Sequence, residues 1–318
     1  MSRVIIRSIK EHSLDEAIAS ILSFCGVARA IQRDTKVLLK PNLCTERVEM
    51  IHTANTSLAV IESVVKHLRE MTPHITIGEA DGARYTVEQA YETNGVNDLA
   101  RRYGIRAINF SREEQVSVPN EVLGHWSFAR QFLETDFLVS LPVLKTHATT
   151  VFTGAVKNQW GCVPRRDRLV WHKYLDRLLC DIAVLVPVRL TIMDGIIGMQ
   201  GRGPINGYAI NAGVLIGSTD EVAVDATGMR LIGLDPFTSG HIRLAAERGI
   251  GAIAAKDIEI DGDFERLRVT VEPAVQDWAI KLLNLLSRSE FITKKFIMND
   301  SLFYPVRRMV VGLRRLIG

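Results

Sequence analysis

Residues 137–162 read FLVSLPVLKTHATTVFTGAVKNQWGC, and this stretch decides the fold class. The apolar run over 137–141 predicts a short buried strand. A loop rich in Thr and Gly follows, and a helix is predicted to begin shortly before Lys157. A short apolar strand, a polar turn and a helix in succession are the repeating unit of a parallel α/β sheet.

The same unit recurs along the chain. Helices are predicted at 13–26, 56–71 and 96–103, and further apolar strands at 5–6, 37–39, 75–77, 105–110, 189–193 and 214–217. This alternation predicts an α/β fold with a largely parallel sheet and helices on both faces. We expect an α/β domain over 1–272 and a basic helical appendage over 273–318.

Two stretches interrupt this rhythm. Residues 111–124 are polar, with Val at alternate positions, and predict a small β excursion. Residues 195–213 are rich in glycine and predict a long irregular loop. Loops of that length are usually lids or binding loops.

Polar residues gather where the predicted strands end. Because the carboxyl ends of parallel strands meet at one edge of a sheet, where ligands bind, these residues should converge. They are Lys40, Asn42, Glu79, Asp81, Lys145, His147, Asp194 and Asp220. We predict one pocket that contains Lys40, Lys145, His147, Lys157 and Asp194.

The residue types in this pocket indicate chemistry on an anion. Lysine supplies a mobile positive charge for carboxylate or phosphate, and histidine suits proton transfer near neutral pH. The loop before Lys157 would offer free N–H groups at a helix start, which also attract anions. We assign catalytic roles to His147, Lys157 and Asp194, and substrate binding to Lys40, Asn42, Asp81, Lys145, Asn158 and Asp225.

Simpler explanations exist for each residue taken alone. Lysines are mostly solvent-exposed, and Asp-Gly and Lys-Pro-Asn sequences favour ordinary turns. Lys145, His147 and Lys157 all fall within one stretch of thirteen residues at a strand end, which favours a site. Asp81 and Asp194 would either orient a histidine or hold a divalent cation through their oxygens.

Six motifs together resemble the domain-of-unknown-function 362 family. They are KPN at 40–42, EADG at 79–82, LPVLKTH at 141–147, TGAVKNQWG at 153–161, DGIIGMQGRGP at 194–204 and VAVDATGMRLIG at 222–233. The resemblance covers roughly residues 37–262 and implies an α/β fold. The motif residues that it carries over are Lys40, Asn42, Lys145, His147, Lys157, Asn158, Asp194 and Asp225.

The resemblance implies little about cofactors. Many members of the family carry a ferredoxin-type cysteine cluster, but the four cysteines here, Cys25, Cys44, Cys162 and Cys180, lack that spacing, so no iron–sulfur cluster is expected. The run from His147 to Lys157 is also similar to nickel-pincer lactate racemases, in which a lysine holds a pyridinium-type cofactor. Ala155 stands where that family has its second glycine.

Composition sets further limits. The formal net charge of +3 is too small to favour a nucleic-acid partner, and no apolar run reaches the roughly 20 residues that span a bilayer. We expect a cytoplasmic protein, either an enzyme acting on a small carboxylate or phosphate or a non-catalytic nucleotide- or anion-binding regulatory or assembly protein. The reaction type stays open.

The C-terminal segment has its own pattern. Apolar residues recur at helical spacing between arginines over 305–318, which predicts an amphipathic basic helix. We expect it to pack on the body or between two copies, because tertiary packing usually stabilises helices. Weak contact with an anionic membrane surface is the alternative.

Overall fold

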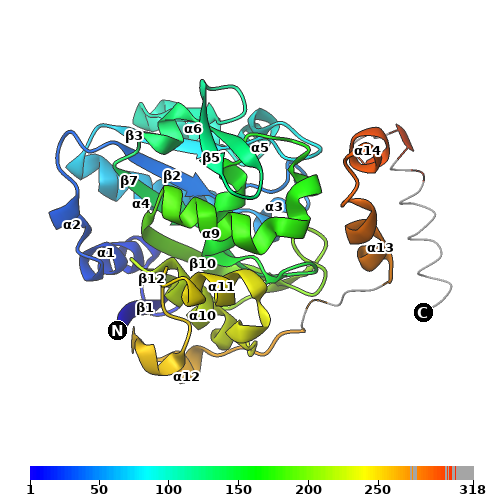
Figure 1. Cartoon of the computed structure of the whole chain (residues 1–318). Coiled ribbons are helices and arrows are strands. Elements are labelled where there is room, and N and C mark those ends of the chain that lie inside the picture. The colour runs from blue at the N-terminus through cyan, green and yellow to red at the C-terminus, as the bar shows by residue number, and fades with distance from the viewer. Residues whose placement is uncertain (273, 275–277, 298, 300, 303–304, 306–318) are drawn as a thin grey trace.

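The computed structural model describes residues 1–272, 274, 278–297, 299, 301–302 and 305 (Figure 1). Eleven of its strands form one sheet, whose main path runs β13-β1-β12-β10-β7-β2-β3-β4. These strands are β1 (Ser2–Ser8), β2 (Val37–Pro41), β3 (Ile75–Glu79), β4 (Arg106–Asn109), β7 (Phe137–Leu141), β10 (Val188–Gln200), β12 (Val214–Ser218) and β13 (Ile258–Asp261).

The sheet is largely parallel, which confirms the predicted fold class. Strands β10, β7, β2, β3 and β4 pair in parallel with their neighbours. Strand β12 runs antiparallel to both β1 and β10. The prediction that Asp220 lies at the shared carboxyl edge was therefore wrong, because the end of β12 points to the opposite edge.

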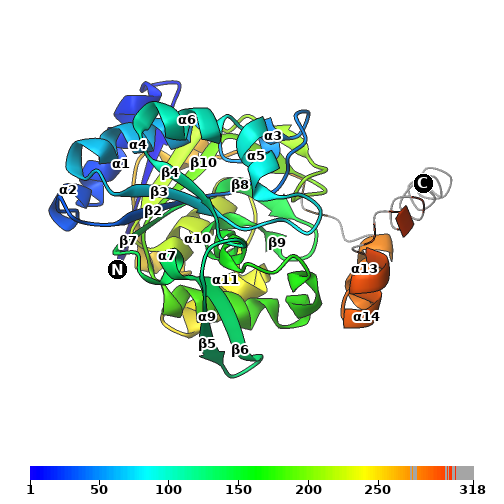
Figure 2. The ribbon, with the colours of Figure 1, turned by 90° about the horizontal axis from the view of Figure 1, so that it is seen from above.

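Helices cover both faces of the sheet, because successive apolar residues of a strand point to opposite sides. Leu39 packs with α1 (Leu14–Phe24), α4 (Leu58–Met71), α5 (Val87–Thr93) and α6 (Val96–Tyr103). Its neighbour Leu38 packs in the second core with α8 (Gly154–Asn158), α9 (Leu175–Leu185), α10 (Glu221–Leu231) and α11 (Gly240–Glu247). The view from above separates the two layers (Figure 2). Shorter helices are α2 (Val27–Ala30), α3 (Ile51–Ala54), α7 (Arg130–Leu133) and α12 (Phe264–Leu267).

The structure confirms the prediction for one of the two irregular stretches, residues 111–124, and corrects the other, residues 195–213. A hairpin of β5 (Gln115–Asn120) and β6 (Gly124–Ala129) confirms the β excursion. The prediction of an irregular loop over 195–213 was wrong in part. Strand β10 continues to Gln200 and pairs with β11 (Tyr208–Ile210), which leaves a turn over 201–207.

A further strand follows β7 directly in the chain. Residues 143–147 form β8 (Val143–His147), which pairs with β10 in parallel and with β9 (Val151–Phe152) as a hairpin. Lys145 and His147 therefore lie on a strand and not in a turn. This strand carries them beyond the end of β7, above the edge of the sheet.

The C-terminal appendage contains α13 (Trp278–Leu286), α14 (Glu290–Ile292) and a π-turn over Thr293–Ile297, and stands beside the body (Figures 1 and 2). The amphipathic basic stretch predicted over 305–318 lies outside the described residues except at Pro305. The domain boundary at 272 stays a prediction. In the described part of the chain, no helix is long and apolar enough to cross a membrane.

Candidate functional site

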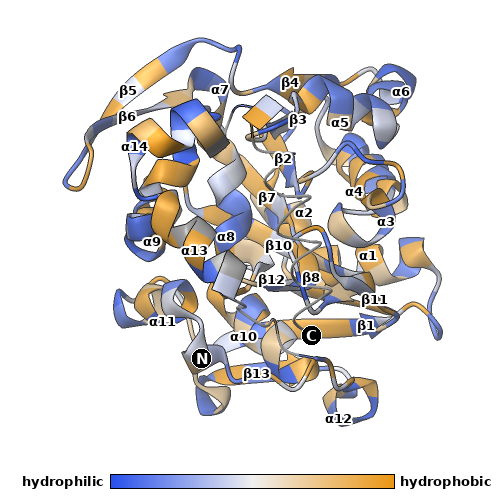
Figure 3. Ribbon diagram, turned by 90° about the vertical axis from the view of Figure 1, so that its right-hand side faces the viewer, coloured by the Kyte–Doolittle hydropathy of each residue, from blue (hydrophilic) through white to orange (hydrophobic). Residues whose placement is uncertain are grey.

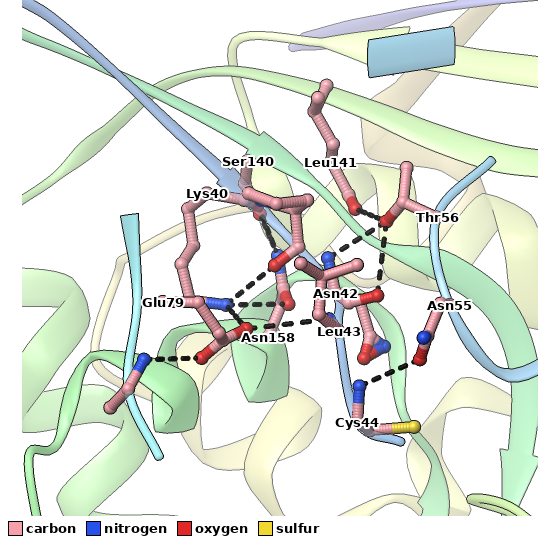
Figure 4. Close-up of polar contacts among 12 residues, drawn as sticks. Lys40, Asn42, Leu43, Cys44, Asn55, Thr56, Glu79, Ser140, Leu141 and Asn158 are labelled. Carbon is pink, nitrogen blue, oxygen red and sulfur yellow. Dashed lines mark hydrogen bonds and ion pairs between the residues drawn. The ribbon is translucent and has the colours of Figure 1, made fainter. Parts of the chain in front are cut away.

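Lys40 is buried in an ion pair at the end of β2. Its side chain is 1% exposed, and Nζ donates to Glu79 Oε2 at 2.6 Å, Pro41 O at 2.8 Å and Asn158 Oδ1 at 3.3 Å (Figure 4). Burial raises the pKa of the Glu79 carboxyl, and the Lys40 charge opposes that rise. The Lys40 ammonium donates to three acceptors inside the protein. Lys40 therefore belongs to a buried group of side chains beneath the site. We call this group the frame; its members are Lys40, Asn42, Lys145, Asn158 and Asp225.

The NQWG sequence is built around this ion pair. Asn158 Nδ2 donates to Lys40 O at 2.9 Å and to Ser140 Oγ at 3.0 Å. A Cβ atom added at Gly161 would lie 2.1 Å from Glu79 Oε1 and 2.7 Å from Lys40 Nζ. Contacts that short do not occur, so any side chain at this position would displace the Glu79–Lys40 ion pair.

Lys145 is also enclosed by the protein. It is fully buried, and Nζ donates to Ala54 O at 2.7 Å, Cys44 Sγ at 3.3 Å and Asn42 Oδ1 at 3.4 Å. A further bond at 3.4 Å reaches Pro204 O in the 201–207 turn. Burial lowers the pKa of this amine. The side chain therefore ties three loops to β8.

Asp225 occupies the start of α8. Its Oδ1 accepts from Ala155 N at 2.5 Å and its Oδ2 from Val156 N at 3.0 Å, while burial raises the pKa of the carboxyl. The expectation of free N–H groups for a ligand was wrong here, because a carboxylate of the same chain accepts from them. Gly154 has φ +60°, and its Cβ would lie 2.2 Å from Asp225 Oδ1.

The other two predicted carboxylates, those of Asp81 and Asp194, also accept hydrogen bonds from backbone N–H groups. Asp81 Oδ1 accepts from Val87 N, at the start of α5, and from Asn109 Nδ2, both at 2.9 Å. Asp194 accepts from Ser57 N at 2.8 Å and Ile196 N at 3.0 Å, and burial raises its pKa to about 6.

Asp194 lines a separate cavity. This cavity has a volume of about 340 Å³ and is shared with Thr56, Ser57 and Asn94. The prediction that Asp194 shares a pocket with Lys157 was therefore wrong. Among the described residues, no group of three or more His, Cys, Asp or Glu side chains is placed to hold a metal ion.

A larger cleft, of about 770 Å³, opens above the frame. Lys157 and His147 line it, together with side chains that sequence reasoning did not assign. The basic side chains in the lining outnumber the one acidic side chain, Glu46. They are Arg47, Arg84, Lys157, Arg166 and Arg168, with His147 and His172 beside them. A cleft with one sign of charge concentrates ligands of the opposite sign.

His147 is held in one tautomer. Its Nδ1 accepts from Thr149 N at 3.0 Å and from Thr150 N at 3.3 Å. A neutral imidazole that accepts at Nδ1 carries its proton on Nε2. Burial, then the charge of Lys157, lowers the pKa of His147 well below its usual range. His147 is thus a neutral hydrogen-bond donor through Nε2.

Lys157 differs from the two frame lysines. Its side chain is partly exposed in the cleft, and no described residue forms a hydrogen bond or ion pair with Nζ. Burial, then the charge of Lys145, lowers the pKa of the Lys157 amine to about 7. Charged and neutral forms of this amine therefore coexist at neutral pH.

Comparison with known proteins agrees with the motifs. The family described as "Domain of unknown function (DUF362)" matches residues 37–230. The chain belongs to this DUF362 family.

A relative of this DUF362 chain is the "Thylakoid-associated protein sll1697" of Synechocystis sp. (strain ATCC 27184 / PCC 6803 / Kazusa). It is 27% identical over 238 residues, which cover 73% of each chain. Two solved structures match the chain at a TM-score of 0.41. One is a protein from Thermotoga maritima, 12% identical, and the match covers 74% of this chain and 59% of that one. The other is the lactate racemase apoprotein from Thermoanaerobacterium thermosaccharolyticum, 10% identical, with 70% and 55% covered.

The motif residues of the DUF362 family fall into two groups in the structure. Lys40, Asn42, Lys145, Asn158 and Asp225 build the buried frame. Lys157 and His147 face the cleft above it.

The cleft residues that sequence reasoning missed had a local signal. Arg166 and Arg168 come five and seven residues after the end of the TGAVKNQWG motif, and His172 comes shortly afterwards. Isolated arginines are mostly surface residues, so the signal was weak without the fold.

The four cysteines lie apart from one another, and Cys44 is the one that lines the cleft among the described residues. Cys25 packs on one face of the sheet and Cys180 on the other. Cys162 is buried, and burial raises its pKa to about 12. The residues present do not fit a cluster held by all four cysteines.

Proposed function

We propose that the protein is an enzyme that binds a small carboxylate or phosphate in the cleft and moves a proton with the Lys157 amine. One observation carries the proposal. Lys40 and Lys145 are closed in by acceptors of the protein, whereas Lys157 lines the cleft with no hydrogen-bond or ion-pair partner in the described part of the chain. A cation that is partly withdrawn from water and has no partner is unfavourable, so this site favours an anion as the partner.

The cleft supports an anion in a second way. Arg168 Nη1 donates to Asp81 O at 3.0 Å and Val163 O at 2.6 Å, so its guanidinium is held at the cleft wall without a carboxylate partner among the described residues. Arginine presents further N–H groups that match carboxylate or phosphate oxygens. A bound anion would thus contact two positive groups, Lys157 on α8 and Arg168 in the segment that follows.

His147 and Lys157 have different roles in the proposed reaction. The Nε2–H of neutral His147 donates a hydrogen bond to a substrate oxygen, where charge develops during proton removal. The Lys157 amine, with its pKa lowered to about 7 by burial and by Lys145, takes or returns the proton near neutral pH. This division replaces the earlier assignment of His147 as the acid–base group.

Sulfate binding tests the anion site, because sulfate keeps its charge across the neutral range. We expect sulfate affinity measured by calorimetry to fall by up to about tenfold per pH unit as pH rises above the Lys157 pKa, since the amine loses its charge. Lys157→Met should remove both the affinity and its pH dependence. Lys256→Met, at an exposed position outside the cleft, is the matched control.

Deuterium exchange tests the proton transfer. The protein is incubated in D2O with a panel of 2-hydroxy and 2-amino carboxylates, and exchange of the C2 hydrogen, next to the carboxylate, is followed by NMR. We expect exchange for at least one compound, and loss of that exchange in Lys157→Met. Sulfate binding that depends on Lys157, with no exchange across the panel, would favour the non-catalytic anion-binding function instead.

A further inference from the structure

Exposed apolar side chains concentrate in the C-terminal appendage. Among the described side chains, seven large ones are exposed over residues 278–302, and seven more are spread over the whole of 1–272. Figure 3 colours much of α13 and α14 orange, the colour of hydrophobic residues. The seven are Trp278, Leu282, Leu285, Leu286, Phe291, Phe296 and Leu302. Apolar surface gathered in one place marks an interaction site.

The spacing on α13 forms one face. Trp278, Leu282 and Leu285 lie four and seven residues apart, which places them along one side of a helix. Lys281 and Arg288 are exposed on the same segment. Lys281 lies beside this apolar face, and Arg288 follows two residues after the end of the helix.

Charge separates the appendage from the body. Residues 273–318 contain eight Lys and Arg against three Asp and Glu, a net charge of +5. Residues 1–272 contain 31 Lys and Arg against 33 Asp and Glu, a net charge of −2. The positive charge of the chain thus resides in the segment that carries the exposed apolar side chains.

We propose that residues 278–297 dock the protein onto an anionic lipid surface. The apolar side chains enter the boundary between headgroups and acyl chains, and the lysines and arginines contact the headgroups. Docking between two copies would bring two segments of charge +5 together, which charge repulsion opposes. At nine residues, α13 is too short to span a bilayer, so the contact is peripheral.

The appendage lies next to the cleft wall. Lys294 Nζ is 3.6 Å from Asp167 Oδ2, and Asp167 sits between Arg166 and Arg168 of the cleft lining. The same Asp167 oxygen accepts from Arg165 at 2.7 Å. A bilayer bound to the appendage would therefore face the side of the molecule that holds the cleft. The membrane proposal does not depend on the chemistry proposed for that cleft.

Vesicle sedimentation of the full chain tests the proposal. We expect the protein to pellet with vesicles of phosphatidylcholine mixed with phosphatidylglycerol, less so as salt rises, and to stay in solution with phosphatidylcholine alone. The double variant Leu285→Asp, Phe291→Asp should stay in solution with both. These two side chains are 60% and 66% exposed.

The matched control is Val184→Asp, Tyr208→Asp, at side chains of the body that are 65% and 70% exposed. It should pellet like the wild type, and thermal unfolding should be the same for both double variants. Wild-type protein that stays in solution with the anionic vesicles overturns the proposal. So does equal loss in the two double variants. A dimer detected by light scattering and broken by the appendage variant alone, without vesicle binding, would assign the surface to a second copy.

Discussion

Replacing Lys40 separates a structural lysine from a substrate lysine. In Lys40→Met, the Glu79 carboxylate loses its ion pair at 2.6 Å and stays 4% exposed. The donors left to it are Ala80 N at 3.0 Å and Leu43 N at 3.4 Å. The variant must therefore either keep an unpaired buried charge or protonate the carboxyl.

The expected loss in the free energy of unfolding is about 3–5 kcal/mol, the range for removing one partner of a buried ion pair. Glu79→Gln should cost a similar amount, because the ammonium keeps Pro41 O and Asn158 Oδ1 but loses its counter-charge. The double variant should lose less than the sum of the two, by about 1–3 kcal/mol, since residues in contact couple on that scale.

Urea unfolding measures these values, with the dependence on urea unchanged if the native state stays compact. Lys66→Met is the control, because Lys66 pairs with Asp15 at the exposed surface, where an ion pair contributes about 1 kcal/mol or less. The reasoning fails if Lys40→Met unfolds within about 1 kcal/mol of the wild type, the size of an ordinary surface effect. If sulfate affinity is lost in that case, Lys40 is a ligand residue.

Two further variants probe the frame. Gly154→Ala should lower the free energy of unfolding by more than about 2 kcal/mol, because left-handed backbone strain costs about 1–2 kcal/mol and the new Cβ would clash with Asp225 Oδ1 at 2.2 Å. Gly104→Ala is the control, because Gly104 has φ +61° and no atom within 4 Å of the added Cβ. Urea unfolding of this control should show the cost of the strain alone. Asp194 has its pKa raised from 3.8 to about 6, so its protonated form is favoured by folding, and that stability is present below about pH 4 and lost as pH rises through 6. Across this window, Asp194→Asn should gain about 3 kcal/mol relative to wild type, and parallel pH profiles of the two proteins would contradict the assignment.

The fold was predictable because it depends on local patterns. Adjacent apolar pairs such as Leu38 and Leu39 indicated strands buried on both faces, and these two side chains do pack in different cores. The direction of β12 was not predictable in the same way. An apolar strand followed by a helix looks alike whether the strand runs parallel or antiparallel, because strand direction depends on pairing with β1 and β10 far away in the sequence.

The location of the candidate site was predictable, but which of its lysines are structural and which faces the cleft was not. From the sequence, Lys40 and Lys145 were assigned to substrate binding and Lys157 to catalysis, so all three lysines were expected to face the ligand. Which lysine is free depends on acceptors from distant segments, such as Glu79 for Lys40 and Ala54 O for Lys145. Those partners lie 39 and 91 residues away along the chain, beyond the reach of local spacing.

This division changes how mutations in the family motifs should be interpreted. The frame residues hold one another, so loss of Asn158 removes an acceptor from Lys40 Nζ and a donor to Lys40 O at once. Activity measured on total protein would then fall for frame and cleft variants alike, because fewer molecules fold. Ligand affinity per folded molecule separates the two classes: it should stay near the wild-type value in frame variants that still fold, and fall in Lys157 variants whose unfolding midpoint has not moved.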